Sequence, residues 1–179
     1  MKRILAFCLA ILCFVCITSC AGNNAKANFA KVTLPWYVVS LSDINTESFD
    51  IENYIQQTGY VNAQLNEDLS LTITMTQEQY QEELNNMRTQ VEDACDQLTS
   101  ENECVIDITK SEDYSEITIF VDGEAYEYAW FIPQFAIGIP VIIYQAVLGI
   151  EIYTEISVID IASNDVLLHS VLPNDILPQ

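Results

Sequence analysis

The chain has 179 residues, of which 50% are hydrophobic, and 26 acidic against six basic side chains give it a formal net charge of −20 at pH 7. Its length suits one domain with a proper hydrophobic core. The few cations are scattered, which excludes a nucleic-acid-binding protein, because displacing counterions from phosphates requires clustered Lys and Arg side chains.

The first stretch is organised like an export signal. Two basic residues precede an uncharged apolar run over residues 4–17, which is shorter than the ~20 residues that span a bilayer. The run ends on an aliphatic residue, two small residues and a cysteine, Ile17-Thr18-Ser19-Cys20. This stretch resembles the signal of bacterial lipoproteins. The resemblance implies that the Cys20 thiol receives a diacylglyceryl group and that residues 1–19 are removed as a signal peptide.

The acidic charge and the lipid together predict how the mature chain is held. Removing residues 1–19 of 179 leaves 160 residues with 4 basic and 26 acidic side chains, a formal charge near −22. Two acyl chains anchor a protein stably, whereas anionic headgroups repel an acidic body. Residues 20–30 are small and polar and predict a flexible tether. We therefore expect a lipid-anchored protein on the extracytoplasmic side of the cell membrane; the alternative is an ordinary secretory signal with a chance cysteine.

Residues 31–179 are predicted to form a single domain that begins with a short strand and a first helix–hairpin unit. The strand ends at Pro35. The helix begins after Asp50, a good N-cap, and Gly59 ends it. Alternating apolar residues over 60–75 predict the hairpin that follows.

The second helix has the clearest pattern in the chain. Thr76 and Gln79 fit a capping box, and apolar residues then recur every three or four positions as far as Leu98. Its other face is acidic and rich in amides, so the helix packs by one side only. The next hairpin is expected to turn six residues inward: Cys104, Ile106, Ile108, Ile117, Ile119 and Val121.

A third unit closes the chain. Residues 123–131 predict a short helix, and residues 139–148 predict a helix that is apolar nearly all round and therefore buried. The helix over residues 139–148 would be only ~15 Å long and so cannot cross a membrane. A helix that lies at the membrane interface is the alternative. Strands follow over about 152–161 and 166–172. The sum is an α+β fold in which hairpins from three helix–hairpin units join one antiparallel sheet with helices packed on one face.

Three stretches of the mature chain carry a second resemblance. They are Lys31-Val32-Thr33-Leu34-Pro35, Asn66-Glu67-Asp68-Leu69-Ser70 with the strand after it, and Tyr144-Gln145-Ala146. With them the chain resembles a group of small, uncharacterised lipoproteins of Gram-positive anaerobes. Glycine is common in that group where Leu69 stands, so the turn here is expected to be built differently. The resemblance implies neither an activity nor a catalytic residue.

The cysteines outside the signal offer one pairing. With Cys20 acylated, Cys95 and Cys104 are the remaining pair, and they would close a short loop between a helix end and a strand start. An extracytoplasmic location permits this disulfide, which would contribute roughly 2–3 kcal/mol. Two buried free thiols are the alternative, and both remain open. No spacing of His, Cys and carboxylates is typical of a zinc site.

Candidate catalytic residues are few. His169 is the one histidine, and it lies in a predicted strand, where a strand-face role is the simpler interpretation. No glycine-flanked serine motif or phosphate-binding glycine loop occurs. Paired carboxylates carry no information in a chain with 26 acids. The sequence therefore predicts no catalytic site.

The tips of the three predicted hairpins are acidic. Asp68, Asp113 and Asp165 each lie one or two residues from a Ser or an Asn, and such residues favour tight turns by bonding their own backbone. The alternative is that the tips gather on one edge and offer hard oxygen ligands to Ca²⁺. Apart from this calcium hypothesis, no cofactor is predicted.

Exposed aromatic side chains are a second candidate surface. Trp36, Tyr37 and Trp130 could line a contact with a carbohydrate or a protein, because aromatic rings suit both. Packing in the core is the alternative use. The sequence as a whole predicts a non-enzymatic lipoprotein that binds an extracytoplasmic protein or glycan; the alternatives are an extracytoplasmic carboxylate-based hydrolase and a solute-binding accessory to a transporter.

Overall fold

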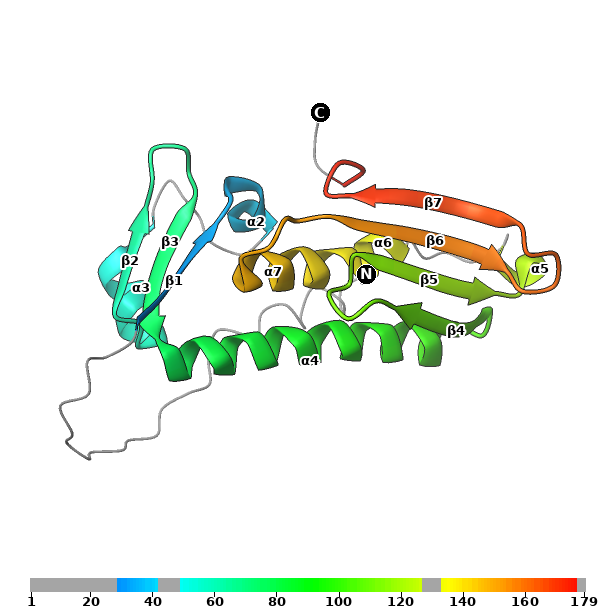
Figure 1. The fold of residues 1–179 in the computed structure, drawn as a ribbon, viewed down its shortest axis with the longest axis horizontal. Helices are drawn as coiled ribbons and strands as arrows, with labels where there is room; N and C mark the ends of the chain where they lie inside the picture. The colour runs from blue at the N-terminus through cyan, green and yellow to red at the C-terminus, as the bar shows by residue number, and fades with distance from the viewer. Residues whose placement is uncertain (1–28, 42–48, 127–132, 177–179) are drawn as a thin grey trace. The chain divides into compact units, whose positions relative to one another are not determined.

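The computed structural model describes residues 29–41, 49–126 and 133–176. These residues form a mixed α and β structure with two sheets, shown in Figure 1. The chain divides into two compact units, the first ending at Glu83 and the second beginning at Leu84, where the sequence predicted a single domain. The boundary lies inside one continuous helix, α4 (Gln77–Glu101).

The first unit contains a three-stranded antiparallel sheet in the order β1-β3-β2. Its elements are β1 (Phe29–Leu34), α2 (Trp36–Leu41), α3 (Ile51–Thr58), β2 (Asn62–Leu65) and β3 (Leu71–Thr76). The predicted ends of α3 are confirmed: the Asp50 carboxylate accepts the backbone N–H of Asn53, and Gly59 ends the helix with φ 70°. The sheet buries one apolar cluster, Val32, Val39, Ala63, Leu71, Ile73 and Met75.

The turn between β2 and β3 places Leu69 in the left-handed region, with φ 63°. A side chain with a Cβ pays roughly 1–2 kcal/mol for this conformation, whereas glycine adopts it readily. The Leu69 side chain is 49% exposed, so it returns little burial energy.

Replacing Leu69 with Gly is therefore expected to raise the free energy of unfolding by about 0.5–1 kcal/mol, measured by urea denaturation. Relief of the left-handed strain outweighs the larger conformational freedom of glycine in the unfolded chain. Val61→Gly is the control, because Val61 is also exposed and has an ordinary φ. That variant should lose about 0.5–1 kcal/mol, and equal losses in both variants would contradict the role of strain.

The second unit contains a four-stranded sheet in the order β4-β5-β6-β7. Its strands are β4 (Val105–Lys110), β5 (Glu116–Val121), β6 (Thr154–Asp160) and β7 (Val166–Leu172). Besides α4, its helices are α5 (Gly123–Tyr126), α6 (Pro133–Ala136) and α7 (Gly138–Leu148). The Thr76–Gln79 capping box of α4 is confirmed, since each side chain accepts the backbone N–H of the other residue.

The predicted single antiparallel sheet is wrong, although each of the three predicted hairpins is present. The β2–β3 hairpin lies in the first unit. The other two hairpins join through β5 and β6, which run parallel, with Glu116 opposite Glu155 and Val121 opposite Asp160. The physical reason is the long connection between β5 and β6, which carries the chain back to the starting end of the sheet, as a parallel pair requires.

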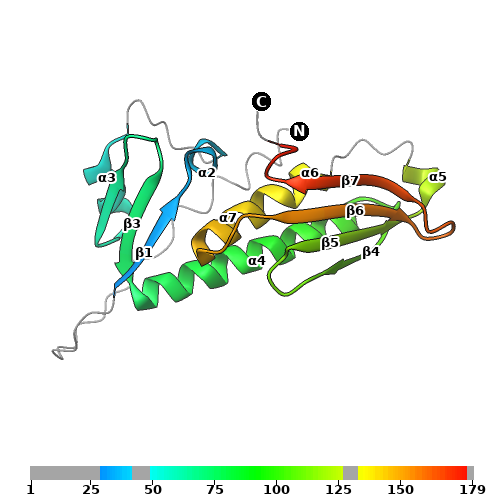
Figure 2. The same ribbon diagram turned by 45° about the horizontal axis from the view of Figure 1, so that its top comes forward.

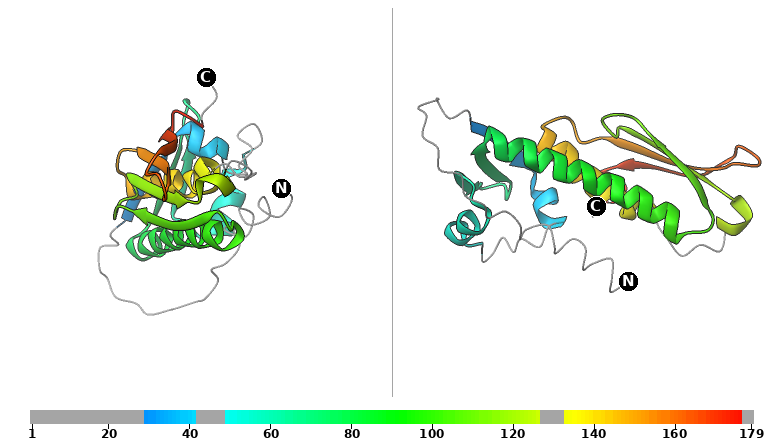
Figure 3. Two further views of the ribbon diagram at one scale, coloured as in Figure 1. Left: turned by 90° about the vertical axis from the view of Figure 1, so that its right-hand side faces the viewer. Right: turned by 90° about the horizontal axis from the view of Figure 1, so that it is seen from below.

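Helices cover one face of the four-stranded sheet. In Figures 1 and 2, α7 and the adjoining length of α4 lie behind the strands, and the left view of Figure 3 shows the strands to one side of α7. The inward residues Ile119 and Val158 are fully buried beneath them. The predicted burial of α7 is confirmed by Val141, Ile142 and Ala146, which lie in this core.

A bulge in β4 changes which residues face the core. The pairing with β5 shifts between Val105 and Asp107, so Val105 is buried. Ile106, which was predicted to face inward, is 46% exposed. The cause is the extra residue of the bulge, which displaces the alternation by one position.

Candidate functional site

Two of the predicted site residues lie outside the described residues. They are Cys20, the predicted lipidation site, and Trp130. Trp36 and Tyr37 lie on α2 in the first unit, with their rings edge to face at a centroid distance of 6.0 Å. Trp36 is 48% exposed and Tyr37 is half-buried, so the described part of the predicted aromatic surface is one exposed ring.

Cys95 and Cys104 are free thiols in the structure, and both are buried. This is the second of the two alternatives that the sequence left open. Burial raises the pKa of Cys95 to about 11 and also raises the pKa of Cys104. Both thiols are therefore protonated at neutral pH, which makes them poor nucleophiles and poor metal ligands.

The turns between β2 and β3 and between β4 and β5 have the same hydrogen-bonding pattern. The Asp68 carboxylate accepts the N–H and the hydroxyl of Ser70 at 3.0 and 2.6 Å. The Asp113 carboxylate accepts the corresponding groups of Ser115 at 3.1 and 2.8 Å. The serine hydroxyl bonds and then the backbone bonds lower the pKa of both aspartates. Their oxygens thus serve the turn, as the simpler sequence interpretation has it.

At the third tip the structure assigns this role to Asp160 rather than to the predicted Asp165. The Asp160 carboxylate accepts the N–H and the hydroxyl of Ser163, the N–H of Ala162 and the N–H of Gly123. Asp165 contributes its backbone N–H to the Ser163 hydroxyl. An Asp three residues before a Ser was a signal that could have found Asp160 in the sequence.

The calcium hypothesis required the tips to share one edge, and this premise is wrong. Because β5 and β6 are parallel, the turns that carry Asp113 and Asp165 lie at opposite ends of the sheet, as Figure 1 shows. Asp68 belongs to the other unit. Within residues 29–41, 49–126 and 133–176, no three His, Cys, Asp or Glu side chains lie close enough together to hold a metal ion.

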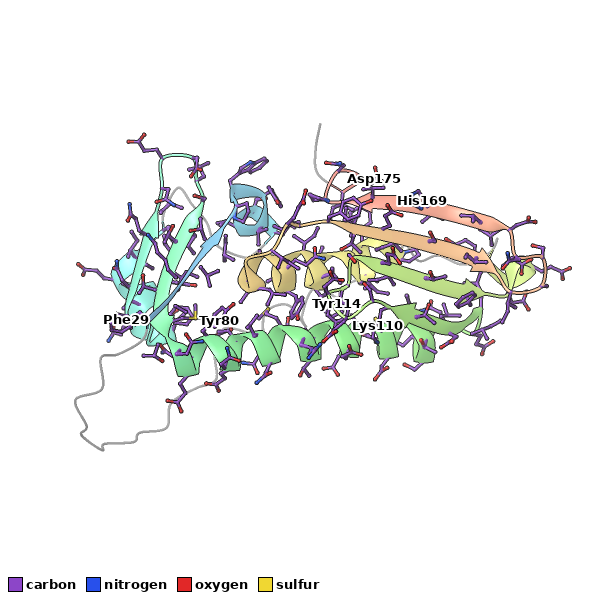
Figure 4. All side chains as sticks on the ribbon, viewed as in Figure 1. Phe29, Tyr80, Lys110, Tyr114, His169 and Asp175 are labelled. Atoms are coloured by element: carbon purple, nitrogen blue, oxygen red, sulfur yellow. The ribbon has the colours of Figure 1, made fainter. Side chains whose placement is uncertain are left out.

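A polar cluster lies between α4 and the sheet. Tyr114 is 2% exposed, and its hydroxyl donates to the Glu92 carboxylate at 2.6 Å. Glu92 also pairs with the Lys110 ammonium at 2.6 Å, and Arg88 bonds to Tyr114. Figure 4 shows Tyr114 and Lys110 side by side at this place. Burial, followed by the Glu92 bond, raises the pKa of Tyr114 to about 12.

Gln145 is a buried polar residue on the otherwise apolar helix α7, and it is 1% exposed. Its amide nitrogen donates to the carbonyl of Asp113 at 3.1 Å and to the carbonyl of Tyr153 at 3.0 Å. Its amide oxygen accepts the N–H of Tyr153 at 3.1 Å. Beside it, the rings of Tyr144 and Tyr114 meet edge to face at 5.1 Å. The motif Tyr144-Gln145 therefore fixes α7 to the β4–β5 turn and to the chain that enters β6.

A cavity of about 330 Å³ opens between α4 and β4. It is lined by Cys95, Asp96, Thr99, Asp107 and Lys110 among others. Its volume is at the lower end of the range for small-molecule sites. The cavity supplies little chemistry, because its one cation is paired with Glu92 and its thiol is protonated.

A serine and the single histidine meet on the face of the four-stranded sheet that no described helix of the second unit covers. Ser157 on β6 stands opposite His169 on β7, with 3.2 Å between the hydroxyl oxygen and Nδ1. A hydrolytic pair also needs a group that orients the imidazole and donors that stabilise an oxyanion. Among the described residues His169 makes no other hydrogen bond, and the two side chains form a cross-strand contact.

Three rows of side chains cross this face of the sheet, which we call the open face. The apolar row is Phe120, Ile159 and Val166; the hydroxyl row is Thr118, Ser157 and His169; the acidic row is Glu116 and Glu155, with Val171 beside them. The sequence did not show these rows, because they follow from the register between β5 and β6. No described helix is both long enough and apolar enough to cross a membrane.

Comparison with known proteins gives no information on function, so the function is argued from the residues described above. No protein-family model, curated protein or solved structure matches the chain.

Proposed function

We propose that the protein is a bacterial lipoprotein, held on the extracytoplasmic side of the cell membrane by a diacylated Cys20, and that its folded part binds another extracytoplasmic component without catalysing a reaction. The observation that carries the proposal is the sequence Ile17-Thr18-Ser19-Cys20 at the end of an apolar run. A thiol is the group that is alkylated in such signals, and the small side chains before it suit the signal peptidase.

The charge of the chain supports a body that stands off the membrane. The net charge of −20 repels anionic headgroups, so the lipid and not the protein surface provides the attachment. The first described strand begins at Phe29, which leaves residues 20–28 as the length of chain between the lipid and the fold.

The causes of the pKa changes in the described residues support a binding function over a catalytic one. The side chains with the largest changes in pKa are Tyr60, Tyr54, Tyr114 and Cys95. All four are at least partly buried, and burial is the main cause of each change. Asp68 and Asp113 are exposed and Asp160 is partly exposed, and the pKa of each is lowered mainly by hydrogen bonds that its carboxylate accepts within its own turn. The open face, by contrast, presents side chains that suit contact with a partner.

Replacing Cys20 with Ser is expected to move the protein from the membrane fraction to the medium, because a hydroxyl is not acylated and the signal then directs secretion alone. Fractionation of cells with immunoblotting measures the distribution, and metabolic labelling with a fatty-acid analogue measures acylation. Cys16→Ser is the matched control, because Cys16 lies inside the apolar run, and it should leave both results unchanged. Retention of the Cys20→Ser protein in the membrane, or a native mass with an unmodified Cys20, would overturn the proposal.

A further inference from the structure

The open face carries a contiguous apolar row. Phe120 stands opposite Ile159, and Ile159 stands opposite Val166, so the three side chains cross three neighbouring strands. Ile119 and Val158, the chain neighbours of Phe120 and Ile159, point into the core and are fully buried. Phe120 and Ile159 are partly exposed and Val166 is 60% exposed; Leu167, the next residue along the chain, and Ile161, just after β6, are also exposed. Single exposed apolar residues are ordinary, whereas a contiguous group of them marks a contact surface.

The other end of the open face is acidic and carries no balancing cation. Glu116 and Glu155 stand directly opposite each other on parallel strands, an arrangement that destabilises the sheet by like-charge repulsion. The Tyr153 hydroxyl donates to Glu155, and that bond, followed by burial and the charges of both glutamates, raises the pKa of Tyr153. In the described part of the second unit the cations are Arg88 and Lys110, and both are engaged in the Tyr114–Glu92 cluster.

Both edges of the sheet are obstructed. At the β7 edge, the N–H of Val171 donates to the Asp175 carboxylate at 2.6 Å, and the Asp175 N–H returns to the Val171 carbonyl. Figure 4 shows Asp175 at this end of β7. At the β4 edge, the bulge at Ile106 breaks the regular ladder. Such features discourage the pairing of another strand, so contact with a partner goes through the face.

Charge complementarity decides which occupant suits the open face. A second copy would place the glutamate pair and a net charge of −20 against the same charges, and anionic lipid would meet the same repulsion. A protein segment with apolar side chains on one side and Lys or Arg beside them would cover the apolar row and neutralise Glu116 and Glu155. We infer that the open face is the docking surface for a basic, amphipathic segment of an extracytoplasmic protein. This inference rests on the proposed function, since it names the partner class of that binding domain.

Zero-length carbodiimide crosslinking on intact cells tests this inference, because the reagent joins a carboxylate to a lysine amine that touches it. The full-length lipoprotein is then purified, and mass spectrometry locates each crosslink. We expect crosslinks from Glu116 and Glu155 to lysines of one other protein, about tenfold more frequent than from Glu101, an exposed acid on α4. Ile159→Ser, which breaks the apolar row, should reduce these crosslinks about tenfold and leave those of Glu101 unchanged.

The other outcomes of the crosslinking distinguish failure of the docking surface from failure of the proposed binding function. A partner joined through Asp50 or Glu52 of the first unit, or equally through all acids, would overturn the docking surface and leave the binding function standing. Crosslinks between two copies of this chain would overturn the partner chemistry. If Ile159→Ser fails to fold, Glu116→Gln with Glu155→Gln keeps the shape of the face, and unchanged recovery of the partner after formaldehyde treatment would contradict the inference. The absence of any partner would remove both proposals.

Discussion

Replacing Gln145 with Leu is expected to lower the free energy of unfolding by about 3–5 kcal/mol. Leu has nearly the volume of Gln, so packing is largely retained. The loss comes from the backbone groups that Gln145 satisfies: the carbonyls of Asp113 and Tyr153 and the N–H of Tyr153. Each group left buried without a partner costs about 1–3 kcal/mol.

Urea and thermal denaturation measure the effect, with an expected fall in Tm of about 10 °C or more. Gln97→Leu is the control, because the Gln97 amide donates to Glu101 at an exposed site. That variant should stay within about 0.5 kcal/mol of the parent. Equal losses in both variants would contradict the role of the buried amide.

Gln145→Glu separates the hydrogen bonds from simple packing. A carboxylate at this buried site would face two carbonyls, so the pKa of the new acid should be raised in the folded state. The variant should therefore be more stable below the ordinary carboxyl pKa and should lose stability as the pH rises toward the folded pKa. A stability that does not change with pH relative to the parent would show that the site is not buried.

Replacing Tyr114 with Ala should cost about 3–5 kcal/mol, because it removes a buried ring together with its contact with Tyr144. Tyr114→Phe keeps the ring and loses only the hydroxyl that donates to Glu92, so it should cost about 1–2 kcal/mol. Tyr153→Phe removes an exposed hydroxyl that also donates to a glutamate, and it should be nearly neutral. Urea denaturation distinguishes the three, and equal effects of the two Phe variants would contradict the burial of the cluster.

The free energy of unfolding at low pH depends on the same cluster of Tyr114, Glu92 and Lys110. Burial raises the pKa of Glu92, but hydrogen bonds from Lys110 and Tyr114 outweigh it, and the net pKa is lowered. A lowered carboxyl pKa gives stability that is present above the ordinary value and is lost as the pH falls through the folded one. In the Tyr114→Phe protein this loss on acidification should be smaller than in the parent.

Local signals in the sequence predicted the ends of elements well. Asp50, Gly59 and the Thr76–Gln79 pair act within one turn of the residues they bond, so nothing distant can change their effect. The strand over residues 166–172 was predicted with the bounds that the structure gives. Helix α2, by contrast, was not predicted, because six residues after a proline carry too short a pattern.

Long-range arrangement was not predictable from one sequence. Whether β5 meets β6 in parallel or antiparallel fashion depends on the path of the connection, which periodicity does not reveal. The same pairing sets the rows of the open face, so the surface that we propose for docking was not visible in the sequence. Gln145 was visible, however, as a lone amide in an apolar helix, and the residue types alone indicate a buried hydrogen-bonding role.

If the chain is anchored as we propose, Asp175 has a consequence for its behaviour on the membrane surface. Lipoproteins confined to a membrane move in two dimensions, where neighbours collide far more often than they would in free solution. A strand border with unpaired amides would turn those collisions into nuclei for aggregation. By accepting the N–H of Val171, the Asp175 carboxylate removes one of the unpaired amides through which such strand pairing would begin.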